Sequence, residues 1–238
     1  MPHRNTEKIT CSVCSNHNCL VKKNFSIEQL SNWEAEKNIN YYKKGDPIFS
    51  IGDPIIGMDI VLKGIVELFL NSQDNKNSII RFATNGEVFG HVSLENETYP
   101  SSSIAKDETM ICFFKNNTLL EMHQSNSKFA FDLISFYSRN HNKTVTRLLQ
   151  SQRMSLREKV ADAVLFLYDQ FGLDENNELR ECFNREDIYS LANTTTEQIS
   201  RQLSDFEKEK IIEKRSRRIA ILDINKLKKI TRFYYTVI

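Results

Sequence analysis

The sequence lacks any apolar run that approaches the roughly 20 residues needed by a membrane-spanning helix. Residues 1–21 are polar and lack the apolar stretch of a signal peptide. We therefore expect a cytoplasmic protein with no membrane partner. Because that compartment keeps thiols reduced, the five cysteines are expected to be free for metal or redox chemistry.

The sequence also lacks an excess of charge of either sign. Its 238 residues include 32 Lys and Arg against 31 Asp and Glu, a formal net charge of +1. No global positive field draws nucleic acid to such a chain, so any DNA binding must use a local basic patch. The length and the 40% hydrophobic content are ordinary for one large or two modest globular domains.

Glycine and proline are scarce and unevenly placed. Six of the seven glycines lie between positions 45 and 90, and Gly172 is the only one after them. Short runs rich in β-branched and aromatic residues lie among or just after these turn signals, at 60–62, 65–70, 78–82 and 110–114. This pattern predicts an all-β sandwich or barrel. No proline follows Pro100, which leaves the second half free to be helical.

Residues 125–151 form a long segment without turn signals and with helical periodicity. One stripe, spaced by three or four residues, consists of Leu133, Tyr137, His141, Thr144 and Leu148. A second apolar set consists of Phe129, Phe136, Val145 and Leu149. Two interpretations remain open: a core helix of one domain, or a parallel dimerisation helix with the first stripe as its interface.

Two helix signals follow one another in the last third of the chain. Asn184 is a candidate N-cap with acidic residues in the following turn. Asn193 tolerates the left-handed conformation of a tight turn. Thr195, followed three positions later by Gln198, has the pattern of a second capped helix, expected from about 195 to 206. The sequence therefore predicts a helix-turn-helix.

The second helix has two distinct faces. Ile199, Leu203 and Phe206 are expected to face the core, whereas Glu197, Ser200, Arg201 and Ser204 share the exposed stripe. Arginine matches the acceptors of guanine in the major groove, and glutamate accepts from the amino group of cytosine. Two short apolar runs beyond it, 211–212 and 219–222, predict a β-hairpin wing. Basic residues accompany this hairpin and suit phosphate contacts, although a solvated charge run is the alternative. The candidate DNA-binding residues are Thr195, Glu197, Gln198, Ser200, Arg201, Lys214, Arg215, Arg217 and Arg218.

Three cysteines near the N-terminus have the spacing C-x2-C-x4-C: Cys11, Cys14 and Cys19. Such thiolates can hold a soft metal or an iron–sulfur cluster, provided that a fourth ligand joins them. Zinc with His17 or Cys112 is the rival, and Cys112 in an apolar strand also suits a core position. Cys182 is interpreted as a free thiol without assigned chemistry.

The stretch 185–203, R-E-D-I-Y-S-L-A-N-T-T-T-E-Q-I-S-R-Q-L, resembles the helix-turn-helix of the CRP/FNR family of bacterial regulators. The E-x-x-S-R pattern at 197–201 is similar to the FNR branch. The resemblance implies an α+β chain with an N-terminal antiparallel β-roll, jelly-roll-like and similar to cyclic-nucleotide-binding domains, a long dimerisation helix and a C-terminal winged helix-turn-helix. The implied divisions are a cysteine-containing arm at 1–24, the roll at 25–124, the helix at 125–152 and the DNA-binding domain at 153–238. It further implies a homodimer that reads an inverted repeat of half-sites similar to TTGAT, with RNA polymerase as a partner.

The same resemblance suggests what the roll senses. The segment from Pro100 to Cys112 is similar to the FNR segment that supplies a distant cluster ligand. It implies a [4Fe–4S] cluster on Cys11, Cys14, Cys19 and Cys112, although the FNR pattern usually has one more residue before the third cysteine. FNR also has an acidic residue on its dimer face where Thr144 stands here.

The sequence also bears on three other functions. Cyclic-nucleotide binders have F-G-E-L and a later Arg-Ser pair. This chain has Phe89-Gly90-His91-Val92 and then serines at 101–103, so no cyclic nucleotide is expected. A different small-molecule effector of the roll, with incidental cysteines, is the alternative. No enzyme is predicted, because radical-SAM, phosphate-cradling and nucleophile-elbow patterns are not found.

Overall fold

The computed structural model describes residues 9–71, 77–90, 97–180 and 182–231. Contacts divide the chain into two compact units, one of Met1–Asn75 with Ile80–Asn140 and the other of Lys76–Ile79 with His141–Ile238. The division falls inside the long helix α4, Ser127–Arg153, so each unit holds part of that helix. No helix in the described part of the chain is both long and apolar enough to cross a membrane.

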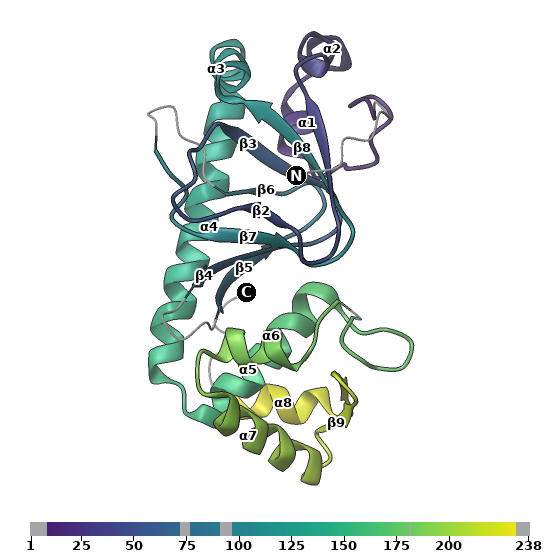
Figure 1. Ribbon diagram of the computed structural model, residues 1–238, viewed down its shortest axis with the longest axis vertical. Helices are drawn as coiled ribbons and strands as arrows, with labels where there is room; N and C mark the ends of the chain where they lie inside the picture. Colours follow the sequence, from purple (N-terminus) through teal and green to yellow (C-terminus); the bar gives the residue numbers. More distant parts are fainter. Residues whose placement is uncertain (1–8, 72–76, 91–96, 181, 232–238) are drawn as a thin grey trace. The chain divides into compact units, whose positions relative to one another are not determined.

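The first unit contains two four-stranded sheets (Figure 1). The first sheet has the order β1-β8-β3-β6 and the second has the order β2-β7-β4-β5. The central strands β8 and β7 each pair antiparallel with two neighbours. This arrangement confirms the antiparallel β-roll that the family resemblance implied, in the region where turn signals predicted a β-sandwich or barrel. The strands are β1 Asn38–Tyr42, β2 Pro47–Phe49, β3 Gly57–Lys63, β4 Val66–Asn71, β5 Asn77–Ala83, β6 Val88–Phe89, β7 Ser102–Ala105 and β8 Thr109–Lys115.

Alternation along β3 gives the roll two apolar clusters, because successive side chains of a strand point to opposite faces. Val61 belongs to the cluster that includes residues of both sheets, such as Leu68 and Ile111. Met58 and Ile60 belong to a second cluster together with helical residues. The described helices of this unit, besides the first part of α4, are α1 Leu20–Asn24, α2 Ile27–Glu34 and α3 Asn116–Ser125.

The long helix was predicted at 125–152 and is observed at Ser127–Arg153. Leu133 is 4% exposed in the second cluster, and Tyr137 is half-buried against it. This differs from the expectation that both residues face a partner subunit, because they pack against the core of the roll in the same chain. The other members of that stripe, His141, Thr144 and Leu148, are exposed.

A stripe of α4 that overlaps the predicted one at Leu148 remains on the surface. Its large members are Phe131, Ile134, Val145, Leu148 and Leu149, all exposed by 38% or more. Positions 131, 134, 138, 141, 145 and 148 alternate by three and four residues, which is the spacing of a coiled-coil seam.

The second unit is built from helices and one β-hairpin. After Ser155, whose side chain forms a capping box with Glu158, helix α5 begins. The hairpin consists of β9 and β10, which pair antiparallel and confirm the predicted wing. The elements are α5 Leu156–Phe171, α6 Arg185–Ala192, α7 Thr196–Lys208, β9 Ile212–Arg215, β10 Arg218–Ile221 and α8 Ile224–Ile230.

Candidate DNA interface and thiol site

The turn between α6 and α7 has the local structure that its sequence signals predict. The Asn184 side chain accepts hydrogen bonds from the backbone N–H groups of Glu186 and Asp187, and so caps α6. Asn193 ends that helix in the left-handed conformation, with φ 48° and ψ 54°. The Thr195 hydroxyl then accepts from the backbone N–H of Gln198 and caps α7. Together these contacts fix a sharp corner between the two helices.

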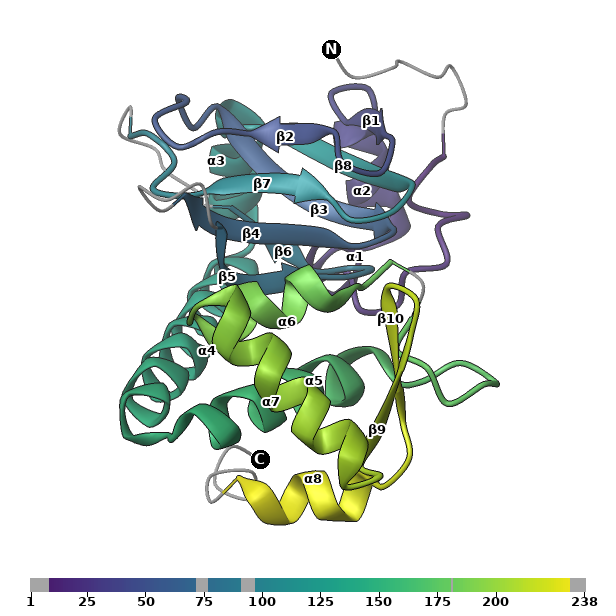
Figure 2. The same ribbon diagram turned by 60° about the horizontal axis from the view of Figure 1, so that its bottom comes forward.

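Helix α7 presents one buried and one exposed face. Ile199, Leu203 and Phe206 are each at most 1% exposed, as predicted. Glu197 and Arg201 are exposed on the other face. Figure 2 shows α7 in front of α5, with the β9–β10 hairpin beside its C-terminal end.

Three other predicted contact residues lie at the start of the exposed face. Thr195 and Ser200 are both exposed. Gln198 is exposed, and its side-chain oxygen accepts from the Thr194 hydroxyl at 2.7 Å. The exposed side chains of this helix are therefore short or hydrogen-bonding groups of the kind that read base edges.

The hairpin cations are more tightly paired than the sequence suggested. Lys214 Nζ lies 3.0 Å from Glu207 Oε2 and donates to Ser204 Oγ at 3.0 Å. Arg215 and Arg218 both contact the buried carboxylate of Glu178, at 3.2 Å and 2.7 Å.

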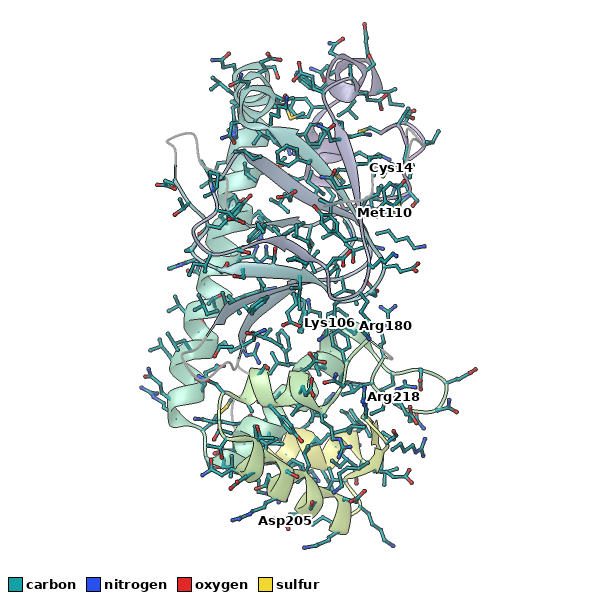
Figure 3. All side chains as sticks on the ribbon, in the orientation of Figure 1. Cys14, Lys106, Met110, Arg180, Asp205 and Arg218 are labelled. Carbon is teal, nitrogen blue, oxygen red and sulfur yellow. The ribbon has the colours of Figure 1, made fainter. Side chains whose placement is uncertain are left out.

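Glu178 belongs to the connection between α5 and α6, which also supplies Asp174 as a second partner of Arg218. The hydrogen bond from Arg218 lowers the pKa of the Asp174 carboxyl. Figure 3 marks Arg218 at the hairpin, next to this connection. Arg217, in contrast, is exposed and forms no ion pair with a carboxylate of the described residues. The basic residues of the wing are thus largely neutralised by acidic neighbours.

The N-terminal cysteines and the distant cysteine of β8 line one cavity. Cys11, Cys14, Cys19 and Cys112 all border it, together with apolar residues of β3 and two lysines. Its volume is about 20 Å³, room for about one water molecule. Cys14 lies on the arm beside the roll (Figure 3).

One side-chain hydrogen bond joins the arm to the roll, and another lies within the arm. Asn16 Nδ2 donates to the backbone oxygen of Leu62 at 2.6 Å, and Lys22 Nζ donates to that of Cys14 at 2.6 Å. A Cβ at Gly86 would stand 3.0 Å from the backbone nitrogen of Cys19. The absent side chain therefore allows the arm to approach the turn before β6 closely.

Burial dominates the electrostatics of these thiols. It raises the pKa values of Cys11 and Cys19, and it raises that of Cys112 to about 12. The Lys37 ammonium opposes this rise at Cys11 and Cys112. In the metal-free protein these thiols are therefore protonated near neutral pH, and ligation would release their protons.

The remaining metal and thiol candidates lie elsewhere. His17 is exposed and does not line the cavity. Cys182 belongs to the second unit, and all five cysteines are free thiols. Among the residues that the structure describes, no three His, Cys, Asp or Glu side chains are arranged to hold a single metal ion.

Lys22 and Lys37 of the cavity, and helix α2 before Lys37, were not predicted from the sequence. Lys37 lies between α2 and β1, and its partner Cys11 is 26 residues away. The S-x-x-Q signal of Ser26 and Gln29, which forms a capping box at the start of α2, was available to predict that helix. Nothing local in the sequence placed Lys37 beside a thiol.

Comparison with known proteins identifies both units. Residues 39–126 match the cyclic nucleotide-binding domain and residues 158–230 match the Crp-like helix-turn-helix domain. Electron transport regulator A of Shewanella oneidensis is 25% identical over 187 residues, which cover 78% of this chain and 75% of that protein. The transcriptional activator protein anr of Pseudomonas aeruginosa is 23% identical over 216 residues, which cover 90% and 88%. FixK2 of Bradyrhizobium japonicum shares the fold, with a TM-score of 0.69, 21% identity and coverage of 82% and 97%. The chain therefore belongs to the CRP/FNR family of transcription regulators.

Proposed function

We propose that this regulator binds DNA as a homodimer and senses oxygen or redox state through a [4Fe–4S] cluster on Cys11, Cys14, Cys19 and Cys112. The observation that carries the proposal is the shared cavity, which joins three thiols of the arm to one thiol of β8, about a hundred residues away in sequence. The Shewanella relative is named as an electron transport regulator, and other relatives are anaerobic regulatory proteins. These names favour a redox signal over an unrelated effector.

The donor set suits a cluster. A [4Fe–4S] cluster is bound by four thiolates, one on each iron, so its ligands surround a volume instead of converging on one ion. The four thiols bordering one cavity provide that set. Because the cavity has room for only about one water, the arm must lie further out when a cluster is bound. When bound, the cluster supplies an oxidisable group whose loss or conversion is the signal.

The residues around the thiols connect them to α4. Cys19 is the N-cap residue of α1, and α1 ends at Asn24. Asn24 Nδ2 donates to Asp132 Oδ2 of α4 at 2.9 Å, and the backbone oxygen of Asn24 accepts from Asn126 Nδ2 at 2.6 Å. One short helix thus links a thiol to the helix that carries the exposed apolar stripe. A shift of the arm has a direct path to the proposed dimer contact.

The exposed stripe of α4 supports a second copy of this chain as its partner. Phe131 and Ile134 are about two-thirds exposed, and Leu148 is 58% exposed. Aligned at coiled-coil spacing, these residues would be buried in a parallel pair of helices. A dimer would also present two α7 helices to the two halves of an inverted repeat. Glu197, Ser200 and Arg201 would contact base edges, while Thr195, Gln198 and the hairpin cations would lie near phosphates. Contact with RNA polymerase remains part of the proposal.

Anaerobic metal analysis tests the proposed cluster. Protein purified without oxygen should be brown and contain about four iron and four sulfide per chain. Cys112→Ser should lose that iron, whereas Cys182→Ser, which changes a thiol outside the cavity, should keep it. Colourless protein that contains zinc would favour a structural metal. Iron-free and zinc-free protein would favour a small-molecule effector of the roll.

A further inference from the structure

The β9–β10 hairpin has two faces that meet different parts of the second unit. Side chains alternate along a strand, so Lys214 points to one face and Arg215 to the other. Arg215 meets Glu178 of the connection between α5 and α6. Lys214 meets α7, because its ammonium lies 3.0 Å from Glu207 Oε2 and donates to Ser204 Oγ at 3.0 Å. Among the hairpin cations, Lys214 therefore joins the wing to the helix that is proposed to read DNA.

Glu207 holds Lys214 with both of its carboxylate oxygens. Its Oε1 accepts from the backbone N–H of Lys214 at 2.9 Å, while its Oε2 pairs with the ammonium of the same residue. These hydrogen bonds from Lys214, the backbone one first, lower the pKa of the Glu207 carboxyl. The two side chains remain 23% and 38% exposed, so the pair contributes little to the stability of the fold. Its effect is to fix one strand of the wing against the end of α7.

The same ammonium fixes a residue of the predicted base-reading stripe. The sequence places Ser204 on the exposed stripe with Ser200 and Arg201, but in the structure it is half-buried. Its hydroxyl donates to the backbone oxygen of Ser200 at 2.9 Å and accepts from Lys214 at 3.0 Å. A hydroxyl has a single proton to donate, so Ser204 cannot donate to a base without losing the first bond. The part of the stripe that is open to DNA therefore ends at Arg201.

We propose that Lys214 is a positioning residue: it holds the wing beside α7, so that phosphate contacts of the wing set the register in which Glu197, Ser200 and Arg201 meet the bases. This inference rests on the proposed function, because it concerns how the same surface discriminates between DNA sequences. Phosphate contacts carry no sequence information, but they fix the orientation and register of a protein on the duplex. A wing that moved freely could satisfy phosphates while the stripe lay out of register. Lys214 then acts through α7 and not through a phosphate contact.

The ratio of two DNA affinities tests this role. The unaltered chain first selects its preferred duplex from a pool of random inverted repeats, and a scrambled duplex of the same composition serves as random DNA. Lys214→Met should lower the ratio of specific to random affinity at least about fivefold, the lower end of the range for losing one base contact. The salt dependence of random binding should stay unchanged, because no phosphate contact is lost. Glu207→Met should lower the ratio likewise, and the double variant no further, since both act through one contact.

Three controls separate positioning from charge and from folding. Lys208→Met and Asp205→Met remove the same charges from exposed residues at the same end of α7, and they should leave the ratio unchanged. Lys214→Arg keeps a cation that can donate to both partners, so it should restore most of the ratio. Urea unfolding of Lys214→Met should have nearly the same midpoint as that of the unaltered chain, because the lost pair is partly exposed.

Each outcome supports or overturns this role. An equal loss of affinity for both duplexes in Lys214→Met, with a salt slope lower by about one ion per chain, would make Lys214 a phosphate contact and overturn the proposal. An unchanged ratio in Glu207→Met would also overturn it, because the wing would then be held without this pair. A ratio that fell as far in Lys208→Met would assign the effect to charge alone and overturn it too. Failure of the unaltered chain to prefer any duplex would instead overturn the proposed function, and this inference with it.

Discussion

Two buried carboxylates, one in each unit of this regulator, have different surroundings. In the first unit Asp59 is buried beside a neutral neighbour: it is 7% exposed, and it accepts its hydrogen bond from the hydroxyl of Tyr99. In the second unit, carboxylates such as Glu178 and Glu207 are paired with the arginines and lysine of the hairpin. A buried carboxyl without a counter-charge has a pKa near neutral pH, so its protonation state changes easily. A carboxylate in an ion pair stays ionised. This contrast fits the proposed function, in which the first unit senses and the second binds DNA.

The largest expected effect concerns α4, which runs through both units. Leu148→Glu places a charge in the exposed apolar stripe and should prevent two helices from packing, because burying an unpaired carboxylate is costly. Losing simultaneous contact with two half-sites should weaken binding to an inverted repeat about 100-fold or more. Analytical ultracentrifugation and a binding titration measure both effects.

Lys143→Glu is the control, since this exposed residue lies on the opposite side of the same helix from the stripe. A Leu148→Glu protein that stayed dimeric would place the dimer contact on another surface. A dimer lost equally in the control would indicate that any added charge on α4 has this effect.

A second test concerns the buried carboxyl of the first unit. Burial raises the pKa of Asp59 to about 7, well above its value in an unfolded chain. Stability due to the protonated form is therefore complete below about pH 4 and is lost as the pH rises through about 7. Asp59→Asn should remove that loss and raise the free energy of unfolding at pH 8 by about 2–4 kcal/mol. Urea titrations at pH 5.5 and pH 8 measure the difference, and equal pH dependence in both proteins would contradict the contrast between the units.

A third test concerns the exposed face of α7. Arg201→Ala should weaken binding to the specific site by about 1–3 kcal/mol, the range for one bidentate contact with a base. Lys208→Ala removes the same charge at the end of the helix and should have a smaller effect. Fluorescence anisotropy with specific and random duplexes measures both. An equal loss on random DNA would make Arg201 a phosphate contact.

The smallest expected effect concerns the hairpin. Arg217 is its one basic residue without an ion pair among the described residues, so it should be the most available for phosphate. Arg217→Ala should weaken specific and random binding alike and reduce the salt dependence by about one ion. Arg215→Ala should change the salt slope less, because that cation already has carboxylate partners. The reverse order would show that DNA displaces those partners.

Local signals explain which parts of the structure were predictable. The caps at Asn184 and Thr195 and the left-handed Asn193 depend on neighbours within three residues, so the sequence alone revealed them. Turn residues and runs of β-branched and aromatic residues likewise indicated β3, β4, β5 and β8, whereas the other four strands of the roll were not predicted. Structural features that depend only on residues close together in the sequence can therefore be predicted without a structure.

Features that depend on distant partners were not predictable in this way. Periodicity showed that α4 has apolar stripes but did not reveal that Leu133 packs into the roll while Ile134 stays exposed. Arg218 pairs with Asp174, which is 44 positions away in the sequence. The sequence therefore suggested a higher net positive charge at the hairpin than the structure has. Which stripe faces the core, and which charges meet, is settled only by the fold.

One measurement tests the link between the two units most directly. A single anaerobic sample is titrated with an inverted-repeat duplex while its visible absorbance is recorded, and it is then exposed to air and titrated again. The account predicts a brown protein that binds the duplex tightly, and loss of the colour together with at least about a tenfold loss of affinity. Tight binding that persists after the colour has gone, or a colourless protein that binds equally well throughout, would contradict it.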